Sequence, residues 1–289
     1  MTYIIYHKDC MDGVSSASIA ENALSPEALI TLIPLQYSKE DELFKVDLTK
    51  QDICYFVDFS LKRDKMLQLA DLVDRVIVID HHKTAQAELV DLPDNVEVNF
   101  NMTESGATLT WQYFHTAPTP LIFEYIKDRD LWLWKLTNSK EFNEALAFLV
   151  IPNDTLSFKQ VLLKSEFSEL VELGKILIEK QSRQVQSKLT KVADLSLCNI
   201  DLKVINVTEN ISELGNAICT EYNKPALMYF ITQDMKVICS LRSTNDLPDV
   251  STIAVTFGGG GHRNACGFTV DLPAFMQYVL KIQPCKDTQ

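Results

Sequence analysis

The 289-residue sequence predicts an α/β protein with a mostly parallel, Rossmann-like sheet in its N-terminal domain and a smaller C-terminal α/β domain. In the first half, short β-rich runs alternate with helical patterns, and this spacing favours right-handed crossovers and a parallel sheet. A long helical stretch follows, and strands then return. We therefore place the domains at residues 1–195 and 196–289, with a helical connector at about 158–195 in the first.

The first half contains the elements of one open sheet. Strands are expected at 3–6, 29–35, 53–57, 75–79 and 96–100. Helices are expected between and after them, at 15–24, 61–72, 107–114 and 121–127.

The second half begins with a helical stretch at 158–192, in which leucine and isoleucine recur near the helical period. Its later part is polar enough to be an exposed connector. Strands then follow at 202–207, 226–232, 236–241 and 266–270. They alternate with helices at 211–222, 250–257 and 273–282.

The composition is that of a globular protein, with 46% hydrophobic and 23% charged residues. No apolar run reaches the ~18 residues of a membrane span. The stretch MTYIIYHKDCMDG lacks the basic region and cleavage site of a signal peptide, so we expect a cytoplasmic protein that does not contact membranes. Seven scattered cysteines, without a CxxC pair, are expected to be reduced thiols.

The net charge of −12 argues against a broad nucleic-acid surface, because long polymers are held by many Lys and Arg contacts to phosphates. A short phosphorylated ligand remains compatible with this charge, since a few local cations or metal ions can hold one phosphate group.

Three strands of the first half end in acidic residues, and two of these ends also carry histidine. The residues are His7 with Asp9 and Asp12, then Asp58, then Asp80 with His81 and His82. A single aspartate after a strand is usually a helix N-cap. Three such ends on one sheet edge should instead converge, because ligands gather at the carboxyl ends of parallel strands. Histidine with carboxylate suits Mn²⁺, Fe²⁺ or Zn²⁺, so the pattern predicts a metal site.

A fourth acidic segment, IKDRDLWLW, carries Asp128 and Asp130 after a helix. It fits either a further part of the site or a charged turn above two tryptophans, and the residues leave both readings open. His115, which lies outside all these motifs, is interpreted as an ordinary loop residue.

The C-terminal half contains a glycine-rich segment, FGGGGHRNACGF, which leads directly into a strand. Glycines let backbone amides approach an anion, and His262 and Arg263 supply donors beside them. Arg242, at the end of an earlier strand, can meet a phosphate with two parallel hydrogen bonds. The segment favours phosphate or carboxylate binding over a merely flexible loop.

Taken in order, HKDCMDG, VDFS, VIDHHKT and KDRDLW resemble the DHH phosphoesterase superfamily, and LRS with FGGGGHRNACGF resembles its DHH-associated C-terminal domain. The resemblance spans nearly the whole chain. In pattern the sequence is similar to the nanoRNase or oligoribonuclease-type members, which degrade very short RNAs and often dephosphorylate 3′-phosphoadenosine-5′-phosphate.

The resemblance implies two divalent metal ions, usually Mn²⁺. The implied metal ligands are His7, Asp9, Asp12, Asp58, His81 and Asp128, with Asp58 as the bridge and Asp130 as the fallback for Asp128. The implied catalytic residues are Asp80, which orients a histidine or the loop, and His82, which contacts phosphate or supports the ligands. The implied substrate contacts are Arg242, Ser243, Gly260, Gly261, His262 and Arg263.

The first motif departs from the family pattern, whose aspartates are commonly two apart. Here Cys10 and Met11 separate Asp9 from Asp12. Either Asp9 reaches the metal through a tighter turn, or Cys10 occupies that place.

These features lead us to expect a metal-dependent phosphoesterase for short oligonucleotides, with its active site in a cleft between the two domains. A phosphomonoesterase for 3′-phosphoadenosine-5′-phosphate and a non-catalytic nucleotide sensor are the alternatives. The expected partner is a short oligonucleotide or phosphorylated nucleotide, and a homodimer is left open.

Overall fold

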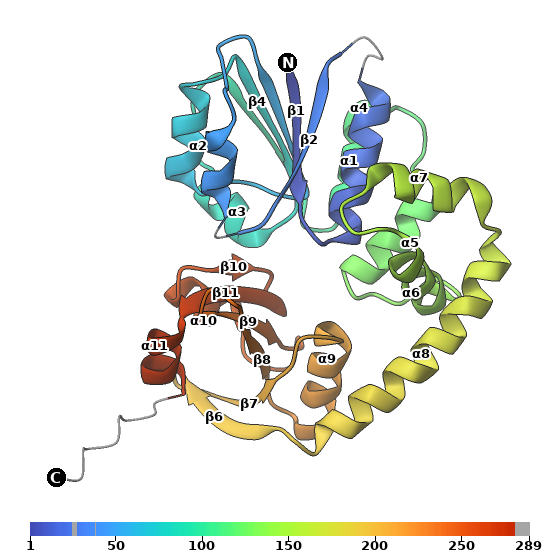
Figure 1. Ribbon diagram of the computed structural model, residues 1–289, viewed down its shortest axis with the longest axis vertical. Helices are drawn as coiled ribbons and strands as arrows, with labels where there is room; N and C mark the ends of the chain where they lie inside the picture. Colours follow the sequence, from blue (N-terminus) through green and yellow to red (C-terminus); the bar gives the residue numbers. More distant parts are fainter. Residues whose placement is uncertain (25–27, 38, 281–289) are drawn as a thin grey trace. The chain divides into compact units, whose positions relative to one another are not determined.

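The computed structural model describes residues 1–24, 28–37 and 39–280 (Figure 1). The chain forms two compact units, Met1–Lys180 and Gln181–Gln289, which we call unit 1 and unit 2. The division falls inside helix α8 (Phe167–Leu189), rather than after 195 as placed from the sequence.

Unit 1 is built on a five-stranded sheet in which every neighbouring pair is parallel. In spatial order its strands are β2 (Ile30–Leu35), β1 (Thr2–His7), β3 (Ile53–Val57), β4 (Arg75–Asp80) and β5 (Val96–Phe100). The parallel α/β sheet predicted from the sequence is thereby confirmed. Because β2 lies on one side of β1 and β3 on the other, the strand order reverses at β1.

Helices cover both faces of this sheet (Figure 1). Ile4 of β1 packs with α1 (Met11–Ala23) and α4 (Gly106–Phe114) on one face. Ile5 packs with α2 (Arg63–Ala70) and the 3₁₀ helix η1 (Glu40–Lys45) on the other. Burial of both faces explains why the central strands β1, β3 and β4 are nearly continuous apolar runs and not alternating ones.

The remaining helices of unit 1 follow the sheet. They are α3 (Lys83–Glu88), α5 (Leu121–Asp130), α6 (Ser139–Leu149) and α7 (Thr155–Lys164), with α8 after them. The sequence pattern did not predict α3 or α6, and it predicted a single helix where α7 and α8 stand. Ser165 separates these two, because its backbone is extended at φ −108° and ψ 133°.

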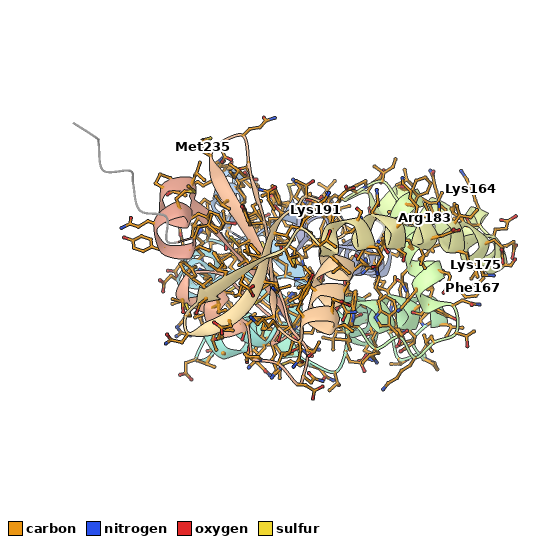
Figure 2. The ribbon with its side chains drawn as sticks, turned by 90° about the horizontal axis from the view of Figure 1, so that it is seen from below. Lys164, Phe167, Lys175, Arg183, Lys191 and Met235 are labelled. Carbon is orange, nitrogen blue, oxygen red and sulfur yellow. The ribbon has the colours of Figure 1, made fainter. Side chains whose placement is uncertain are left out.

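Helix α8 belongs to both units. Its early residue Leu170 is buried in the core of unit 1, whereas Val185 and Leu189 are buried in a cluster of unit 2 residues. Figure 2 labels Phe167, Lys175 and Arg183 along this helix, and all three side chains are exposed. The boundary between the two units therefore falls within a continuous helix.

Unit 2 contains a six-stranded mixed sheet. In spatial order its strands are β10 (Gly260–Gly261), β11 (Ala265–Asp271), β9 (Lys236–Arg242), β8 (Ala226–Ile231), β7 (Ile200–Asn206) and β6 (Ala193–Leu197). Only β7 and β8 pair in parallel, and α9 (Ile211–Tyr222) connects them. The other helices are α10 (Ser251–Thr256), α11 (Leu272–Ala274) and the π-helical turn η2 (Phe275–Val279).

The sequence pattern did not predict β6 or β10. The end of its last predicted helix, 281–282, and Cys285 lie outside the described residues. Cysteines within the described part are free thiols. In that same part, no helix is both long and apolar enough to cross a membrane.

Candidate metal centre

The carboxyl ends of β1, β3 and β4 lie side by side, because these strands are adjacent and parallel. His7 is the last residue of β1, and Asp58 follows β3 directly. Asp80 ends β4, and the two histidines follow it. The strand order reverses at β1, so the edge between β1 and β3 is the topological switch point at which open α/β sheets bind ligands.

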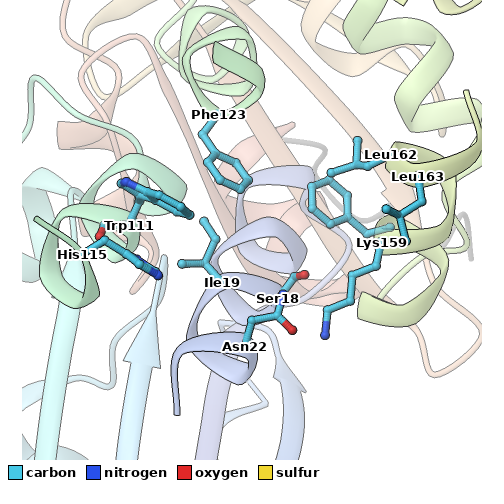
Figure 3. Close-up of a pocket in the computed structure, with 10 residues that line it drawn as sticks. Ser18, Ile19, Asn22, Trp111, His115, Phe123, Lys159, Leu162 and Leu163 are labelled. Carbon is cyan, nitrogen blue, oxygen red and sulfur yellow. The ribbon is translucent and has the colours of Figure 1, made fainter. Parts of the chain in front are cut away.

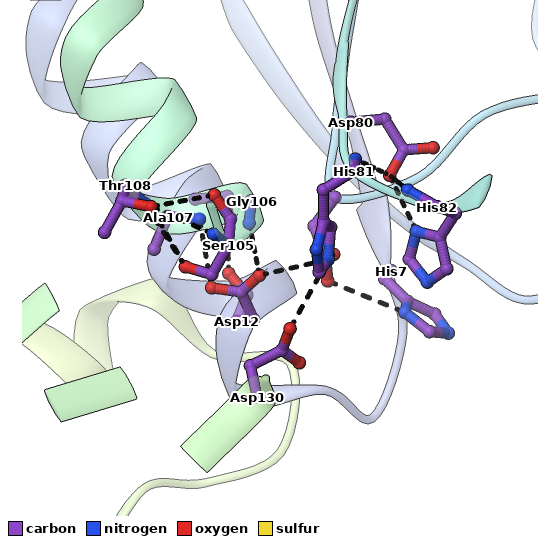
Figure 4. A network of polar contacts seen from close by, with 12 residues as sticks. His7, Asp12, Asp80, His81, His82, Ser105, Gly106, Ala107, Thr108 and Asp130 are labelled. Atoms are coloured by element: carbon purple, nitrogen blue, oxygen red, sulfur yellow. Dashed lines mark hydrogen bonds and ion pairs between the residues drawn. The ribbon is translucent and has the colours of Figure 1, made fainter. Parts of the chain in front are cut away.

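Figure 4 shows His7, Asp12, His81 and Asp130 gathered at this edge, and both histidines contact Asp58. The Asp58 side chain is 1% exposed; Oδ1 lies 3.1 Å from Nε2 of His81, and Oδ2 lies 3.5 Å from Nδ1 of His7. Burial by itself raises the pKa of the carboxyl group, but the close contacts and charges of both histidines outweigh burial and hold the pKa below its ordinary value. Asp58 is therefore placed as an anion between two imidazoles.

Asp12 lies in the first turn of α1 and faces the start of α4. Its Oδ1 accepts a hydrogen bond from the backbone N–H of Ala107 at 3.0 Å, and its Oδ2 accepts one from Gly106. Ser105 caps this helix by accepting from the backbone N–H of Thr108. The N-terminus of α4 thus holds the Asp12 carboxylate in place.

Gly106 is a site residue that the sequence interpretation missed. A Cβ there would collide with the Asp58 side chain and would lie 2.9 Å from Asp12 Oδ2, so only glycine permits this approach. The available signal was the capping sequence SGAT that opens α4, since Ser105 and Thr108 form a capping box.

Of the two aspartates in the KDRDLW segment, the structure brings Asp130 to the cluster. Its Oδ2 lies 3.5 Å from Nε2 of His81. Ligand atoms of Asp12, His81 and Asp130 all lie within 4.8 Å of one another. Asp128 is more deeply buried than Asp130, but its two oxygens accept from the backbone N–H groups of Lys135, at 2.8 Å, and of Leu136. Asp128 therefore stabilises the turn after α5.

In the first motif, HKDCMDG, the Asp9 carboxylate lies outside the cluster of histidines and carboxylates. It is exposed, and its oxygens accept from Asn153 Nδ2 at 2.7 Å and from Gln36 Nε2 at 3.2 Å. Cys10 instead presents its thiol within 4.8 Å of the ligand atoms of His7 and Asp58. Burial, followed by the charge of Asp58, raises the pKa of this thiol well above its ordinary value.

Asp80 organises the histidine pair. It is fully buried, and its Oδ1 lies 2.7 Å both from the backbone N–H of His81 and from Nδ1 of His82. Burial by itself lowers the pKa of His82, but the charge and hydrogen bond of Asp80 outweigh burial and raise it. His82 is thus held in a fixed orientation and favoured as a cation.

Tyr37 is, after Gly106, a second residue beside the cluster that the sequence interpretation missed. Its ring centroid lies 5.5 Å from that of His7, 6.0 Å from that of His82 and 4.7 Å from that of Phe59. The residue follows β2, at the same carboxyl edge as the other strand ends, and nothing in the local pattern distinguishes it.

The cluster concentrates negative charge away from water. Burial, followed by the charges of Asp58 and Asp130, raises the pKa of Asp12 well above its ordinary value. The Oδ2 atoms of Asp58 and Asp130 are buried and accept no hydrogen bond from any residue that the structure describes. Buried carboxylates are costly without compensating charge. Carboxylate and imidazole donors suit Mn²⁺, Fe²⁺ and Zn²⁺, so this residue set fits divalent metal ions.

The predicted substrate residues of unit 2 are held by local contacts. Arg242, at the end of β9, donates to Ser212 Oγ at 3.0 Å and to the carbonyl of Leu241 at 2.9 Å. Ser243 Oγ donates to the carbonyl of Pro248 at 2.6 Å. Arg263 donates to three carbonyls in the loop 244–247, so its guanidinium group holds that loop.

The glycine-rich segment is a tight hairpin and not a loose loop. Gly260 and Gly261 form β10, which pairs with Gly267 and Cys266 of β11. Gly261 has φ +127°, a left-handed conformation that favours glycine. The backbone N–H of His262 donates to the carbonyl of Ala265 at 2.8 Å and closes the turn.

A separate pocket of about 420 Å³ lies in unit 1 between α1, α4 and α7 (Figure 3). Trp111 and His115 stack at its wall, with ring centroids 3.9 Å apart. Lys159, the cationic residue in the lining, already pairs with Glu21 at 2.7 Å. The pocket shares no residue with the metal centre, and its lysine is neutralised by Glu21, so we do not place the substrate there.

Comparison with known proteins adds a family match. Residues 202–282, in unit 2, match the DHHA1 domain. An uncharacterized protein, R106, of Acanthamoeba polyphaga mimivirus is 31% identical over 285 residues, which are 91% of this chain and 66% of that protein. Oligoribonuclease NrnB of Bacillus subtilis is 24% identical over 299 residues, which are 93% of this chain and 73% of that protein. The chain thus spans about two thirds to three quarters of these relatives.

Two solved structures share the fold. The pGpG-specific phosphodiesterase PggH of Vibrio cholerae has a TM-score of 0.50 at 15% identity, with 94% of each chain covered. RecJ of Thermus thermophilus, in complex with Mn²⁺, has a TM-score of 0.53 at 14% identity, covering 96% of this chain and 50% of RecJ.

A parallel α/β unit whose strand ends gather histidines and aspartates, followed by a mixed-sheet unit, defines a DHH-type protein. The match to the DHHA1 domain and the similarity to NrnB agree with this class. The chain belongs to the DHH phosphoesterase superfamily, which includes nanoRNase-like members.

Proposed function

We propose that this protein is a metal-dependent phosphoesterase that hydrolyses phosphodiester bonds of short oligonucleotides. The observation that carries the proposal is the cluster of three carboxylates around His81, in which two buried carboxylate oxygens accept no hydrogen bond from the described residues. Divalent ions bound there would supply an activated water and neutralise charge on the phosphoryl oxygens.

The ligands would fall into two groups, with Asp58 shared between them. One group contains Asp12, His81 and Asp130, and the other lies around His7. Asp58 directs Oδ1 toward His81 and Oδ2 toward His7, which suits a bridging carboxylate. We expect Mn²⁺ at the oxygen-rich group, because carboxylates suit that ion.

His82 and Asp80 would act on the phosphate itself. Asp80 holds the imidazole ring of His82 through Nδ1 and so fixes its orientation beside the cluster. A cationic imidazole there would donate to a phosphoryl oxygen and stabilise charge that develops during attack.

The size of the substrate follows from charge. A net charge of −12 disfavours a long polyanion, whereas Arg242 and the donors around the β10–β11 turn would suffice for one or two phosphate groups. The relative NrnB is named an oligoribonuclease, which agrees with a short substrate.

The test is hydrolysis of a labelled diribonucleotide by the purified chain with Mn²⁺. His81→Ala should abolish cleavage, because it removes a proposed ligand, whereas His115→Ala, a histidine outside the cluster, should retain it. Faster release of phosphate from 3′-phosphoadenosine-5′-phosphate than cleavage of the dinucleotide would favour a phosphomonoesterase. Binding of either compound without turnover would indicate a nucleotide sensor and contradict the proposal.

A further inference from the structure

We propose that Cys10 supplies a thiolate ligand to the metal position beside His7. This position would then take a softer ion, such as Zn²⁺, Fe²⁺ or Co²⁺, than a site made of carboxylates alone. The inference rests on the metal centre of the proposed function, but it does not depend on which substrate is hydrolysed.

The thiol and two established neighbours form a compact donor set. Cys10, His7 and Asp58 each present a ligand atom within 4.8 Å of the other two. Asp58 Oδ2, which faces His7 at 3.5 Å, is buried and accepts no hydrogen bond from the described residues. A cation bound by all three groups would satisfy that oxygen.

Cys10 also lies where helix capping does not use its side chain. It is the N-cap residue of α1, a helix of 13 residues, and its side chain makes no capping hydrogen bond. The sulfur is therefore not committed to the helix, and coordination of a metal ion there would release the thiol proton.

Asp9, the alternative ligand, is held elsewhere. Its φ of 57° turns the chain away from β1, and its backbone N–H donates to Asn153 Oδ1 at 2.7 Å while its own Oδ1 accepts from Asn153 Nδ2. Asn153 is itself anchored, because its carbonyl accepts from Tyr6 Oη at 2.7 Å. Moving the Asp9 carboxylate to the metal would break its hydrogen bonds to Asn153 Nδ2 and Gln36 Nε2.

The spacing of the first motif gives the same assignment. Asp12 lies in the first turn of α1, and the residue two positions before it is Cys10, not Asp9. Compared with the common family spacing, this motif has one extra residue between its aspartates. The extra residue moves Asp9 out of the ligand position and moves the Cys10 thiol into it.

The experiment adds Co²⁺ to the metal-free full-length chain and records its absorption. We expect a thiolate-to-cobalt charge-transfer band in the near ultraviolet, at one equivalent. Cys10→Ser should remove the band and weaken Co²⁺ binding at least about tenfold, since even changes behind the ligands cost 10–100-fold. Cys10→Asp should bind Mn²⁺ better relative to Co²⁺ than the wild type does.

Two matched variants serve as controls. Asp9→Asn should keep the band, and so should Cys198→Ser, which alters an exposed thiol outside the site. Stoichiometric Co²⁺ binding without the band, or no Co²⁺ binding alongside Mn²⁺-dependent hydrolysis, would overturn the thiolate assignment and leave the proposed function standing. The band without hydrolysis of any substrate would support the thiolate assignment and contradict the proposed function.

Discussion

At the residue scale, the close approach of α4 to Asp12 and Asp58 determines which side chains the candidate metal centre can contain. Gly106 lets the first turn of α4 reach Asp12, so two backbone N–H groups meet the carboxylate. Asp58 turns the chain out of β3 with φ 53° while its amide still bonds to the carbonyl of Ile79 at 3.0 Å. The carboxylate oxygens that we propose as metal ligands are therefore positioned by backbone geometry.

Asp130 and Asp128 provide a residue-scale test. Asp130→Asn should lower Mn²⁺ affinity at least about tenfold, because it removes a charged proposed ligand beside His81. Asp128→Asn should keep Mn²⁺ affinity and cost about 1 kcal/mol of stability, because an amide can accept only one of the two backbone hydrogen bonds. Calorimetric Mn²⁺ titration and urea unfolding measure both. Loss of Mn²⁺ binding in the Asp128 variant alone would reverse the assignment.

At the element scale, α8 depends on a close contact with α6. Gly174 lies against the backbone of Glu141, and a Cβ there would collide with the Glu141 carbonyl group. Leu170, one turn earlier, is buried in the same unit. This half of α8 is therefore packed against unit 1 through a position that has no room for a side chain.

Gly174→Ala tests this packing, because two effects have opposite signs. In an exposed helix the change would stabilise by up to about 1 kcal/mol, through helix propensity. Here we expect destabilisation of about 1–3 kcal/mol through overpacking. Ile176→Ala, on the same helix with a side chain 69% exposed, should change stability little. Thermal unfolding distinguishes these outcomes, and a more stable Gly174→Ala chain would show that α8 does not pack as described.

At the scale of the whole molecule, the two units carry different chemistry. The histidine and carboxylate cluster of strand ends is in unit 1, and Arg242 and the glycine hairpin are in unit 2. We therefore expect metal binding and substrate binding to be separable by mutation.

Arg242→Ala tests this division of roles. It should leave Mn²⁺ content unchanged and weaken use of a dinucleotide by about ten- to a hundredfold, the worth of a charge-assisted hydrogen bond of ~1.5–3 kcal/mol. The loss should appear in KM if the contact is equal in ground and transition states, and in kcat as well if it strengthens. Arg75→Ala, an exposed arginine of β4, is the control. Wild-type kinetics in the Arg242 variant would contradict a substrate role.

The elements that the sequence determined are those with local signals. Apolar runs at regular spacing predicted the five parallel strands, and acidic residues or histidines directly after β1, β3 and β4 predicted where a site would form. Strand periodicity and strand-end chemistry are properties of short segments, so they can be read without knowing the contacts. The helices α3 and α6 and the strands β6 and β10 carried weaker local signals and were missed.

Only the tertiary structure distinguished neighbouring candidates. Asp128 and Asp130 both lie in α5. Residues two apart on a helix are related by a rotation of about 200° about the helix axis, so their side chains leave opposite faces and only one of them faces the cluster. Asp9 is held by Asn153, which is 144 positions away in sequence. The need for glycine at 106 likewise comes from side chains of α1 and of the residue after β3. These choices depend on contacts between distant segments, which no local pattern encodes.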